Sequence, residues 1–269
     1  YIVRGTIMAN LTVAILGATG RVGGWLLEEC LERNDDFSSV RVLCRSKAKL
    51  EAYAEKELLT IIEGDATNED DVSQLLEVGV DVIIATLGSP SKHKVIMKEC
   101  AETLVKVLLQ IDQQKIPRVI WMTSTGINEA TDQAKMYSFW GSPNKLLFGY
   151  GLFGLLQFKI LINFVIGWPL WNDMGHSETV IRGENSIYEK TVLVRPTNMY
   201  PPSEHKVFSE EWRNEGGSNL GYQFVKADDP PPGKWMVRKA IAVALVDLAT
   251  KDKSHDGSAV SLFQKGVAE

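Results

Sequence analysis

The chain has 269 residues, a formal net charge of −5 and a pI near 5.5, with 45% apolar and 23% charged residues. This balance is typical of a soluble globular protein with room for one large or two small domains. No cluster of Lys and Arg supplies the basic face that nucleic acid needs, so a nucleic-acid partner is not expected. The cysteines, Cys30, Cys44 and Cys100, lie far apart and form no CxxC pair. They predict neither a disulfide framework nor a zinc site, and they favour the cytoplasm or another reducing compartment.

The first strand is predicted at residues 12–16, a continuous apolar run that ends in glycine. Short β-branched runs then alternate with segments of helical periodicity: helix 21–33, strand 40–44, helix 47–54, strand 59–63, helix 68–76, strand 81–85, helix 91–114 and strand 118–122. This alternation requires right-handed crossovers and a parallel sheet with helices on both faces. The fold class is therefore α/β, a doubly wound, Rossmann-like sheet.

The second half of the chain is less regular. We expect a helix at 173–184, a strand at 191–194, an irregular stretch at 195–232, a helix at 234–250 and a short strand at 259–263. No repeat and no clear linker interrupts the sequence. We therefore expect one domain over residues 1–269, with a small C-terminal elaboration in which residues 195–232 form loops on the substrate side.

Two segments call for separate interpretation. Residues 1–7 lack the apolar core of a signal peptide, and we expect the native chain to start at Met8. Residues 146–171 are strongly apolar, but Lys159 and Pro169 interrupt them, which argues against a membrane-spanning helix. A helix buried on the body or covering a pocket is the better interpretation, with contact to a membrane surface left open.

A glycine-rich turn follows the first strand and opens the first helix, with the spacing GxxGxxG. Glycines allow a tight turn and a close approach of the backbone to a pyrophosphate, and the helix N-terminus supplies free N–H groups and a positive dipole. The strand before the turn and the helix after it supply the context that separates this motif from a simple βα turn. The predicted binding residues are Gly17, Ala18, Thr19, Gly20, Arg21, Val22 and Gly23.

The end of the second strand indicates which dinucleotide binds. NAD specificity normally comes from an acidic residue there, which accepts a hydrogen bond from the ribose 2′-OH. In this chain the strand is followed by Arg45-Ser46-Lys47, and a guanidinium at Arg45 can pair with a 2′-phosphate. The sequence therefore predicts NADP(H), the alternative being that Arg45 is a solvated surface residue.

Two further strand ends fall at the same edge of the sheet. Asp65 and Ala66 close the third strand, where a carboxylate can reach the adenine amino group. Thr86, Leu87 and Gly88 close the fourth strand, at the carboxyl edge where ligands of open sheets lie. Together with the glycine turn they predict a continuous dinucleotide site.

These motifs, together with Thr123-Ser124 after the fifth strand, resemble the atypical short-chain dehydrogenase/reductases. The similarity is greatest to NmrA-like and biliverdin or flavin reductase-like NADP-binding proteins. Asp173 and Glu178, followed by a run that ends in Arg195-Pro196, are similar to the "D-x₄-E … T-x-V-R-P" pattern of that group. The resemblance covers residues 11–263.

The resemblance implies roles for residues near the nicotinamide. The loop with Thr86, Leu87 and Gly88 would lie beside the ring, and Ser124, with Thr123 before it, would lie by the nicotinamide or the substrate carbonyl. The loop after Arg195-Pro196 would border the pocket, through Thr197, Asn198, Met199 and Tyr200.

The sequence shows no standard pair of residues for proton donation. Short-chain dehydrogenases use a Tyr-x-x-x-Lys pair, and the single match, Tyr222 with Lys226, lies far beyond the fifth strand and is interpreted as coincidence. In related atypical proteins a Lys can stand four residues before the Glu, where this chain has Met174. His176 on the same helix can donate a proton at neutral pH, with a plain helix-surface His as the alternative.

Other chemistries find no support in the sequence. The four histidines, His93, His176, His205 and His255, form no metal-binding spacing, and Ser124 is not in a GxSxG elbow. The first hypothesis is an NADPH-dependent reductase of a planar, apolar or aromatic small molecule. The second is an NmrA-like sensor that binds NADP without turnover and reports to a protein partner. A third is an assembly factor that docks through the apolar stretch.

Overall fold

The computed structural model describes residues 10–89, 91, 94–124, 127, 168–199, 221–226 and 235–264. Residues 1–7, the apolar stretch up to residue 167, and most of the loops between 200 and 234 lie outside the described residues. The predictions made for them stay predictions.

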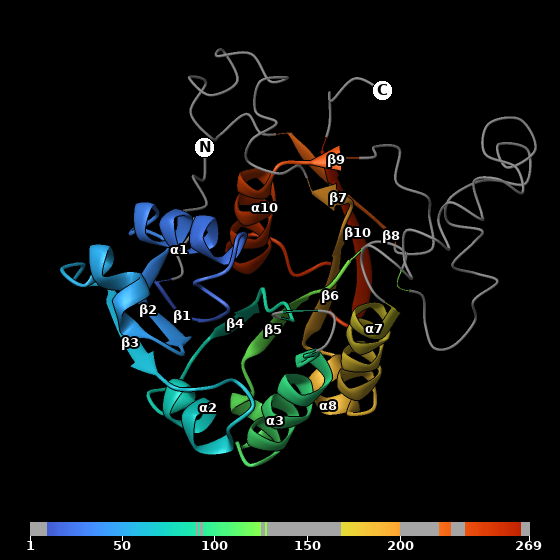
Figure 1. Ribbon diagram of the computed structural model, residues 1–269, viewed down its shortest axis with the longest axis horizontal. Helices are drawn as coiled ribbons and strands as arrows, with labels where there is room; N and C mark the ends of the chain where they lie inside the picture. The colour runs from blue at the N-terminus through green and yellow to red at the C-terminus, as the bar shows by residue number, and fades with distance from the viewer. Residues whose placement is uncertain are drawn as a thin grey trace, which may run out of the picture.

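An eight-stranded sheet forms the centre of the described structure (Figure 1). From one edge to the other its strands are β3 (Leu59–Glu63), β2 (Phe37–Cys44), β1 (Leu11–Leu16), β4 (Val82–Ala85), β5 (Arg118–Met122), β6 (Thr191–Pro196), β10 (Ser258–Gln264) and β8 (Tyr222–Lys226). All neighbouring pairs are parallel except β10 and β8, which are antiparallel. The predicted α/β, doubly wound fold is confirmed.

Helices cover both faces of the sheet (Figure 1). One face carries α1 (Gly23–Glu32) and α10 (Arg238–Thr250). The other carries α2 (Glu69–Leu76), α3 (Met97–Leu109), α7 (Trp168–Arg182) and α8 (Asn185–Tyr188). In β1, Val13 and Ile15 belong to the core of the first face, and Ala14 and Leu16 to the core of the second. Because both faces are buried, the strand reads as an unbroken apolar run rather than an alternating one.

The long helix predicted at residues 91–114 is wrong in extent, since α3 covers only Met97–Leu109. Ser91 and Lys94 form an isolated β-bridge before it, and a short 3₁₀ helix, η2 (Gln113–Lys115), follows it. Asp112 accepts a hydrogen bond from the backbone N–H of Gln114 and so starts that separate turn. Apolar periodicity alone did not reveal these local polar stops.

Other boundaries also differ from the prediction. The segment predicted as a helix at 47–54 is the 3₁₀ helix η1 (Lys47–Tyr53). Helix α7 begins five residues before the predicted start at Asp173. Helix α10 begins at Arg238 rather than at residue 234. The stretch 195–232, predicted to be irregular, contains the end of β6, the short strand β7 (Asn198–Met199) and all of β8. β7 pairs with β9 (Trp235–Met236) in a separate two-stranded sheet.

The three cysteines are free thiols, in agreement with the prediction of no disulfide framework, and the structure shows in addition that all three are buried. Burial raises the pKa of the Cys100 thiol to about 12, and that of Cys30 further still. Thiols in such surroundings stay protonated and are poor nucleophiles. Within the described ranges, no helix combines the length and the apolar character that crossing a membrane requires.

Candidate functional site

The turn between β1 and α1 is built so that only glycine fits at two of its positions. Gly17 has a φ of 90°, and a Cβ there would lie 2.9 Å from the carbonyl oxygen of Thr86. A Cβ on Gly23 would lie 2.0 Å from the carbonyl oxygen of Gly17. The first glycine therefore brings the end of β1 against the loop after β4, and the last packs α1 onto the turn.

The tip of this turn faces outward. Thr19, Gly20 and Arg21 are exposed, whereas Ala18 and Val22 are buried in the core beneath α1. The first turn of α1 contains no acidic residue. The N-cap residue, Val22, makes no side-chain hydrogen bond to the helix. The backbone N–H groups and the positive end of the helix dipole are thus presented to an anion, as a diphosphate cradle requires.

The strand order supplies the second requirement of a nucleotide site. The chain passes from β1 outward to β2 and β3, and then returns to β4 on the other side of β1. In open α/β sheets ligands bind at this point of reversal, at the carboxyl ends of the strands. Gly17 and Thr86 meet there, and the backbone N–H of Thr86 donates to the carbonyl of Leu16. Leu87 and Gly88 follow, half-buried and exposed respectively.

Arg45 is exposed directly after the buried end of β2, so its guanidinium is available to a ligand. The structure adds a carboxylate that the sequence analysis did not consider. Glu63, at the end of the neighbouring strand β3, accepts a hydrogen bond from the backbone N–H of Lys47 at 3.4 Å. Cys44 of β2 pairs with Glu63 of β3 in the parallel sheet, and this register places the Glu63 carboxylate beside Lys47. The register cannot be predicted from residues 44–47 alone.

Asp65 lies in a preorganised loop after β3. Its Oδ1 accepts hydrogen bonds from the backbone N–H and the hydroxyl of Thr67, both at 3.0 Å, and its own N–H donates to Asp71 at 2.8 Å. A Cβ on Gly64 would lie 2.5 Å from Cγ of Asp71, so this capping carboxylate requires glycine. The loop, with Ala66 half-buried in it, is held rigid at the carboxyl edge of the sheet.

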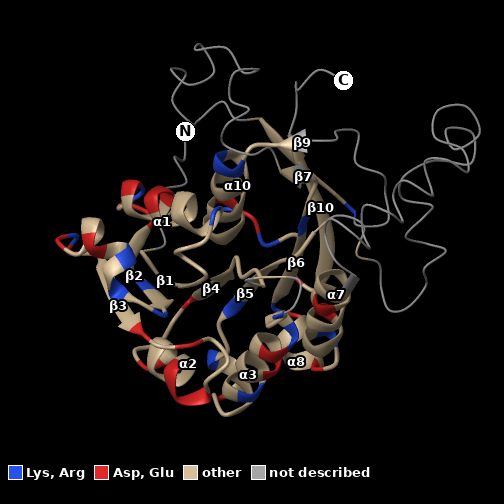
Figure 2. Cartoon of the chain, viewed as in Figure 1, with Lys and Arg blue, Asp and Glu red and all other residues tan. Residues whose placement is uncertain are grey.

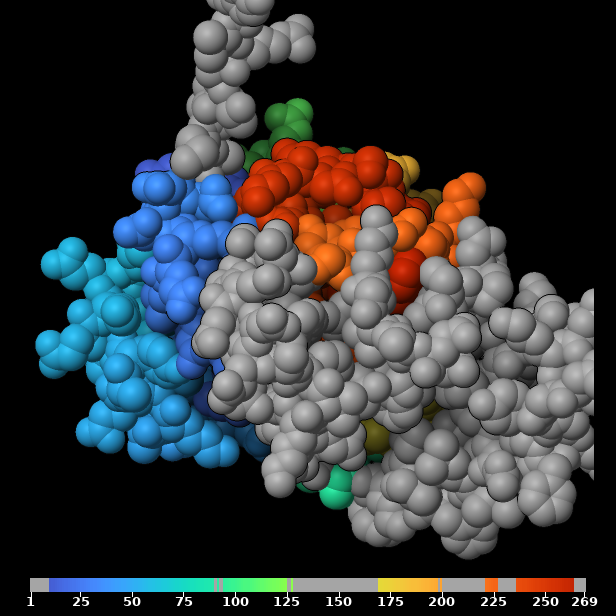
Figure 3. All heavy atoms as spheres, turned by 90° about the horizontal axis from the view of Figure 1, so that it is seen from above, coloured from blue at the N-terminus to red at the C-terminus, as the bar shows by residue number. Residues whose placement is uncertain are grey.

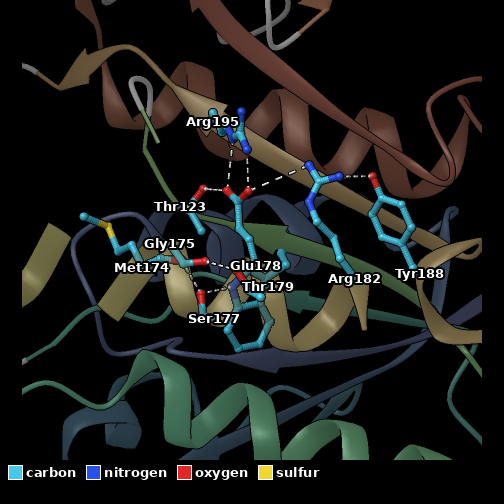
Figure 4. Close-up of polar contacts among 10 residues, drawn as sticks. Thr123, Met174, Gly175, Ser177, Glu178, Thr179, Arg182, Tyr188 and Arg195 are labelled. Atoms are coloured by element: carbon cyan, nitrogen blue, oxygen red, sulfur yellow. Dashed lines mark hydrogen bonds and ion pairs between the residues drawn. The ribbon is translucent and has the colours of Figure 1, made fainter. Parts of the chain in front are cut away.

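A buried ion pair lies behind the end of β5 (Figure 4). Glu178 of α7 accepts hydrogen bonds from Nε and a terminal nitrogen of Arg195 at 3.0 and 2.5 Å. Its Oε1 also accepts from the hydroxyl of Thr123 at 2.6 Å. All three side chains are buried. The hydroxyl of Thr123 is thus engaged inside the fold, and the half-buried Ser124 is the next residue at the carboxyl edge.

The acidic pair at 173 and 178 has structural partners on both sides. Asp173 accepts hydrogen bonds from the backbone N–H groups of Met97 and Lys98, at 2.7 and 3.1 Å, and so caps the N-terminus of α3. It also accepts from the hydroxyl of Ser89. Asp173 and Glu178 therefore fix α7 to α3 and to the sheet, which accounts for the spacing D-x₄-E without a catalytic role.

The candidate proton donors are placed very differently. His176 is exposed, while Glu178, two residues further along the same helix, is buried against β5 and β6. This position agrees with the surface alternative for His176. Met174 is partly buried against the apolar core, so no amine occupies the position of the missing Lys.

Tyr222 donates a hydrogen bond to Asp247 of α10 at 2.5 Å. Burial, followed by this hydrogen bond and the charge of Asp247, raises the pKa of Tyr222 well above its usual value. A catalytic Tyr needs its pKa lowered. The geometry therefore agrees with the interpretation of Tyr222 and Lys226 as a coincidental match.

The described part of the chain holds no group of three His, Cys, Asp or Glu side chains arranged to bind a metal ion. The described polar groups at the carboxyl edge include backbone amides, the guanidinium of Arg45 and the carboxylates of Glu63 and Asp65. A fold of this kind, with a glycine turn at the point where the strand order reverses, defines a dinucleotide-binding α/β protein.

Comparison with known proteins agrees with this class. Residues 17–149 match a family model described as NAD(P)H-binding, which is just under half of the chain. The chain is also 30% identical over 113 residues to averufin oxidase A of Aspergillus flavus, a match that covers 39% of this chain and 40% of the relative.

Solved structures share the whole fold. A Rossmann-fold NAD(P)-binding protein from Shigella flexneri superposes with a TM-score of 0.63 at 18% identity, covering 97% of this chain and 96% of that one. A short-chain dehydrogenase/reductase from Veillonella parvula, solved in complex with NADP, gives 0.63 at 17% identity and covers 95% of both chains. These structures show that the chain has the Rossmann-like α/β fold over nearly its whole length.

Proposed function

We propose that this protein is an NADPH-dependent reductase of a planar, apolar or aromatic small molecule. The observation that carries the proposal is the turn from Gly17 to Gly23, whose glycines leave no room for a Cβ and whose tip presents amides and Arg21 outward. The NAD(P)H-binding family match over residues 17–149 supports the same conclusion. The oxidase named among the relatives supports redox chemistry, although the match spans less than half of that protein.

The dinucleotide would extend along the carboxyl edge of the sheet. The glycine turn would hold its diphosphate, Asp65 and Ala66 its adenine, and Thr86, Leu87 and Gly88 its nicotinamide. When bound, NADPH supplies a hydride to the acceptor. Thr123 would support this end of the site indirectly, because its hydroxyl is engaged by Glu178.

Arg45 would select the phosphorylated cofactor, because its exposed guanidinium can form a forked contact with the 2′-phosphate. The test is calorimetric titration of NADPH and NADH into the native protein and into Arg45→Ala. We expect Arg45→Ala to weaken NADPH binding about tenfold or more, the worth of a charge-assisted hydrogen bond, and to leave NADH binding nearly unchanged.

Equal affinity for the two dinucleotides, unchanged in Arg45→Ala, would contradict the assignment of NADP. Glu63→Gln is a useful companion, since it removes the carboxylate beside Lys47 without touching Arg45. If Glu63 acts on the 2′-position, this variant shifts the preference further toward NADPH.

Ser124 would orient the substrate carbonyl or the nicotinamide, because it follows β5 at the edge where the fourth and fifth strands end side by side. The exposure of His176 favours solvent rather than this side chain as the source of the proton. We expect Ser124→Ala to lower turnover about a hundredfold, in the range typical of losing a positioned polar group, and His176→Gln to leave it within a factor of two.

The activity itself is tested by following the loss of NADPH absorbance with a panel of flavin, quinone and bilin acceptors. Turnover with one class of acceptor, lost in Ser124→Ala but not in His176→Gln, is the expected result. Binding of NADPH with no oxidation across the panel would rule out the reductase.

A sensor that binds NADP without turnover is the second candidate, and a specific observation favours it. Met174 stands where related proteins carry Lys, and Tyr222 is tied to Asp247, so the usual Tyr and Lys pair is absent from the described residues. A sensor distinguishes NADP⁺ from NADPH in affinity and retains a protein partner during purification. Equal affinity for both forms, together with acceptor turnover, would exclude it.

A further inference from the structure

Helices α1 and α10 pack side by side and run in the same direction, in register. Near their beginnings, Nζ of Lys239 lies 5.7 Å from the ring centroid of Trp25. Near their ends, Arg33 pairs with Asp247 at 2.5 Å. Both pairs are separated by 214 residues in sequence (239 − 25 and 247 − 33), so the helices advance together turn by turn. Figure 3 shows the blue N-terminal part and the red C-terminal part of the chain meeting on one face.

This arrangement brings two helix N-termini to the same place. The positive ends of both dipoles point to the carboxyl edge of the sheet, beside the glycine turn. Neither first turn contains an acidic residue. The first turn of α10 is basic instead, because the helix starts with Arg238 and Lys239. Figure 2 shows blue at one end of α10.

Arg238, the first residue of α10, is buried, with only 8% of its surface exposed. Among the described residues it has no hydrogen-bond acceptor and no carboxylate partner. Burial, followed by the like charge of Arg21 in the glycine turn, lowers the pKa of Arg238. Burial of an unpaired charge beside a like charge is unfavourable, and a protein retains it where an anion completes the site.

The other buried arginines show that this is unusual for the chain. Arg41 donates to the carbonyls of Leu75 and Gln74 at the end of α2, and Arg195 pairs with Glu178. Arg118 pairs with Asp256 and also donates to backbone carbonyls. Each of these three guanidinium groups has acceptors within the protein, whereas the described residues offer Arg238 no acceptor and only the like charge of Arg21.

We propose that Arg238, acting with Arg21, binds the diphosphate of the dinucleotide from the α10 side, so that two helix N-termini and two guanidinium groups surround it. The inference rests on the proposed function, since the dinucleotide supplies the anion. It assigns the diphosphate a binding residue that lies 217 positions after Arg21 (238 − 21) and outside the glycine motif.

The diphosphate is common to NADPH and NADH, whereas the 2′-phosphate is not. Loss of Arg238 therefore weakens both dinucleotides by a similar factor, and loss of Arg45 weakens NADPH alone. The test is calorimetric titration of NADPH and NADH into Arg238→Met, which keeps the length of the side chain and removes its charge. We expect both affinities to fall about tenfold to a hundredfold, as for a lost charge-assisted contact.

Lys253→Ala is the matched control. Lys253 is exposed in the loop beyond the opposite end of α10, so its substitution changes the net charge by the same amount far from the glycine turn. We expect this variant to bind both dinucleotides as the native protein does. An equal loss of affinity in Lys253→Ala would show a general charge effect and overturn the assignment.

Thermal unfolding without ligand separates a binding role from a structural one. A buried guanidinium whose anionic ligand is not bound destabilises the free protein. Arg238→Met is therefore expected to unfold at the same temperature as the native chain or at a higher one. A lower unfolding temperature with unchanged affinity for both dinucleotides would make Arg238 a structural residue. If the native protein bound neither dinucleotide, the proposed function itself would fail. If Arg45→Ala weakened NADPH binding but Arg238→Met bound both dinucleotides as the native protein does, the proposed function would hold and the role of Arg238 would be refuted.

Discussion

Gly23 and Gly24 are adjacent in sequence and yet tolerate a methyl group very differently. A Cβ on Gly23 would lie 2.0 Å from the carbonyl oxygen of Gly17, whereas a Cβ on Gly24 would meet only the carbonyl of Ala18, at 3.9 Å. The two positions form a matched pair for testing how closely α1 must approach the turn.

We expect Gly23→Ala to destabilise the protein by about 1–3 kcal/mol or more, the usual cost of overpacking, and to abolish dinucleotide binding. Gly24→Ala is expected to be neutral or to stabilise the protein by up to about 1 kcal/mol, because Ala favours the helix. Urea unfolding and NADPH titration measure both effects. Equal stability of the two variants would show that the contact between Gly23 and Gly17 is not tight.

Glu178 neutralises Arg195 in the interior, and neither side chain can reach water. We expect Glu178→Gln to destabilise the protein by about 3–5 kcal/mol, because it leaves a buried guanidinium without its counter-charge. The double variant Glu178→Leu with Arg195→Met removes both charges and is expected to be less destabilised than the single one. Denaturant unfolding checks this order, and additive losses would contradict the proposed coupling.

At the scale of the elements, α3 has no N-cap of its own. Ile96 precedes it, and the capping carboxylate comes from Asp173, on α7. The cap thus joins two helices that are separated by 58 residues of the chain, residues 110–167.

We expect Asp173→Ala to destabilise the protein by about 0.5–2 kcal/mol, as for other lost caps, and Asp173→Asn to retain most of the stability because Asn also accepts from backbone N–H groups. Hydrogen exchange at the amides of Met97 and Lys98 measures the effect locally. Unchanged protection of these amides in Asp173→Ala would contradict the capping role.

Asp247 joins three elements of the whole molecule. It accepts hydrogen bonds from Arg33 at the end of α1, from Lys251 after α10 and from Tyr222 of β8. Burial by itself would raise the pKa of Asp247, but these hydrogen bonds and the charge of Arg33 lower it below its usual value. The folded state therefore binds the proton less readily than the unfolded state.

This difference predicts how global stability depends on pH. A carboxyl whose pKa is lowered in the folded state contributes stability above its unfolded pKa of about 3.9, and the contribution is lost as the pH falls through the folded pKa. We expect Asp247→Asn to be less stable than the native protein at pH ~7 and to show a smaller further loss on acidification. Chemical unfolding at a series of pH values tests this, with the exposed Asp35→Asn as control. Parallel pH profiles for native protein and Asp247→Asn would contradict it.

The class of fold and the position of the glycine turn can be predicted from the amino-acid sequence, because both depend on short-range features. The apolar run of β1, the spacing of Gly17, Gly20 and Gly23, and the alternation of strands and helices are each contained in a few consecutive residues. The ends of β1 to β5 could likewise be predicted within a few residues, since buried parallel strands are continuous apolar runs.

Which polar residues have structural partners becomes visible only in the packed fold. Asp173 and Glu178 read as part of a functional motif until their partners on α3 and β6 are seen, and Tyr222 matches a catalytic pattern until Asp247 is found beside it. Arg238 attracts no notice in the sequence, because its meaning depends on α10 packing in register against α1. Such contacts join residues far apart in the chain, and no local pattern encodes them.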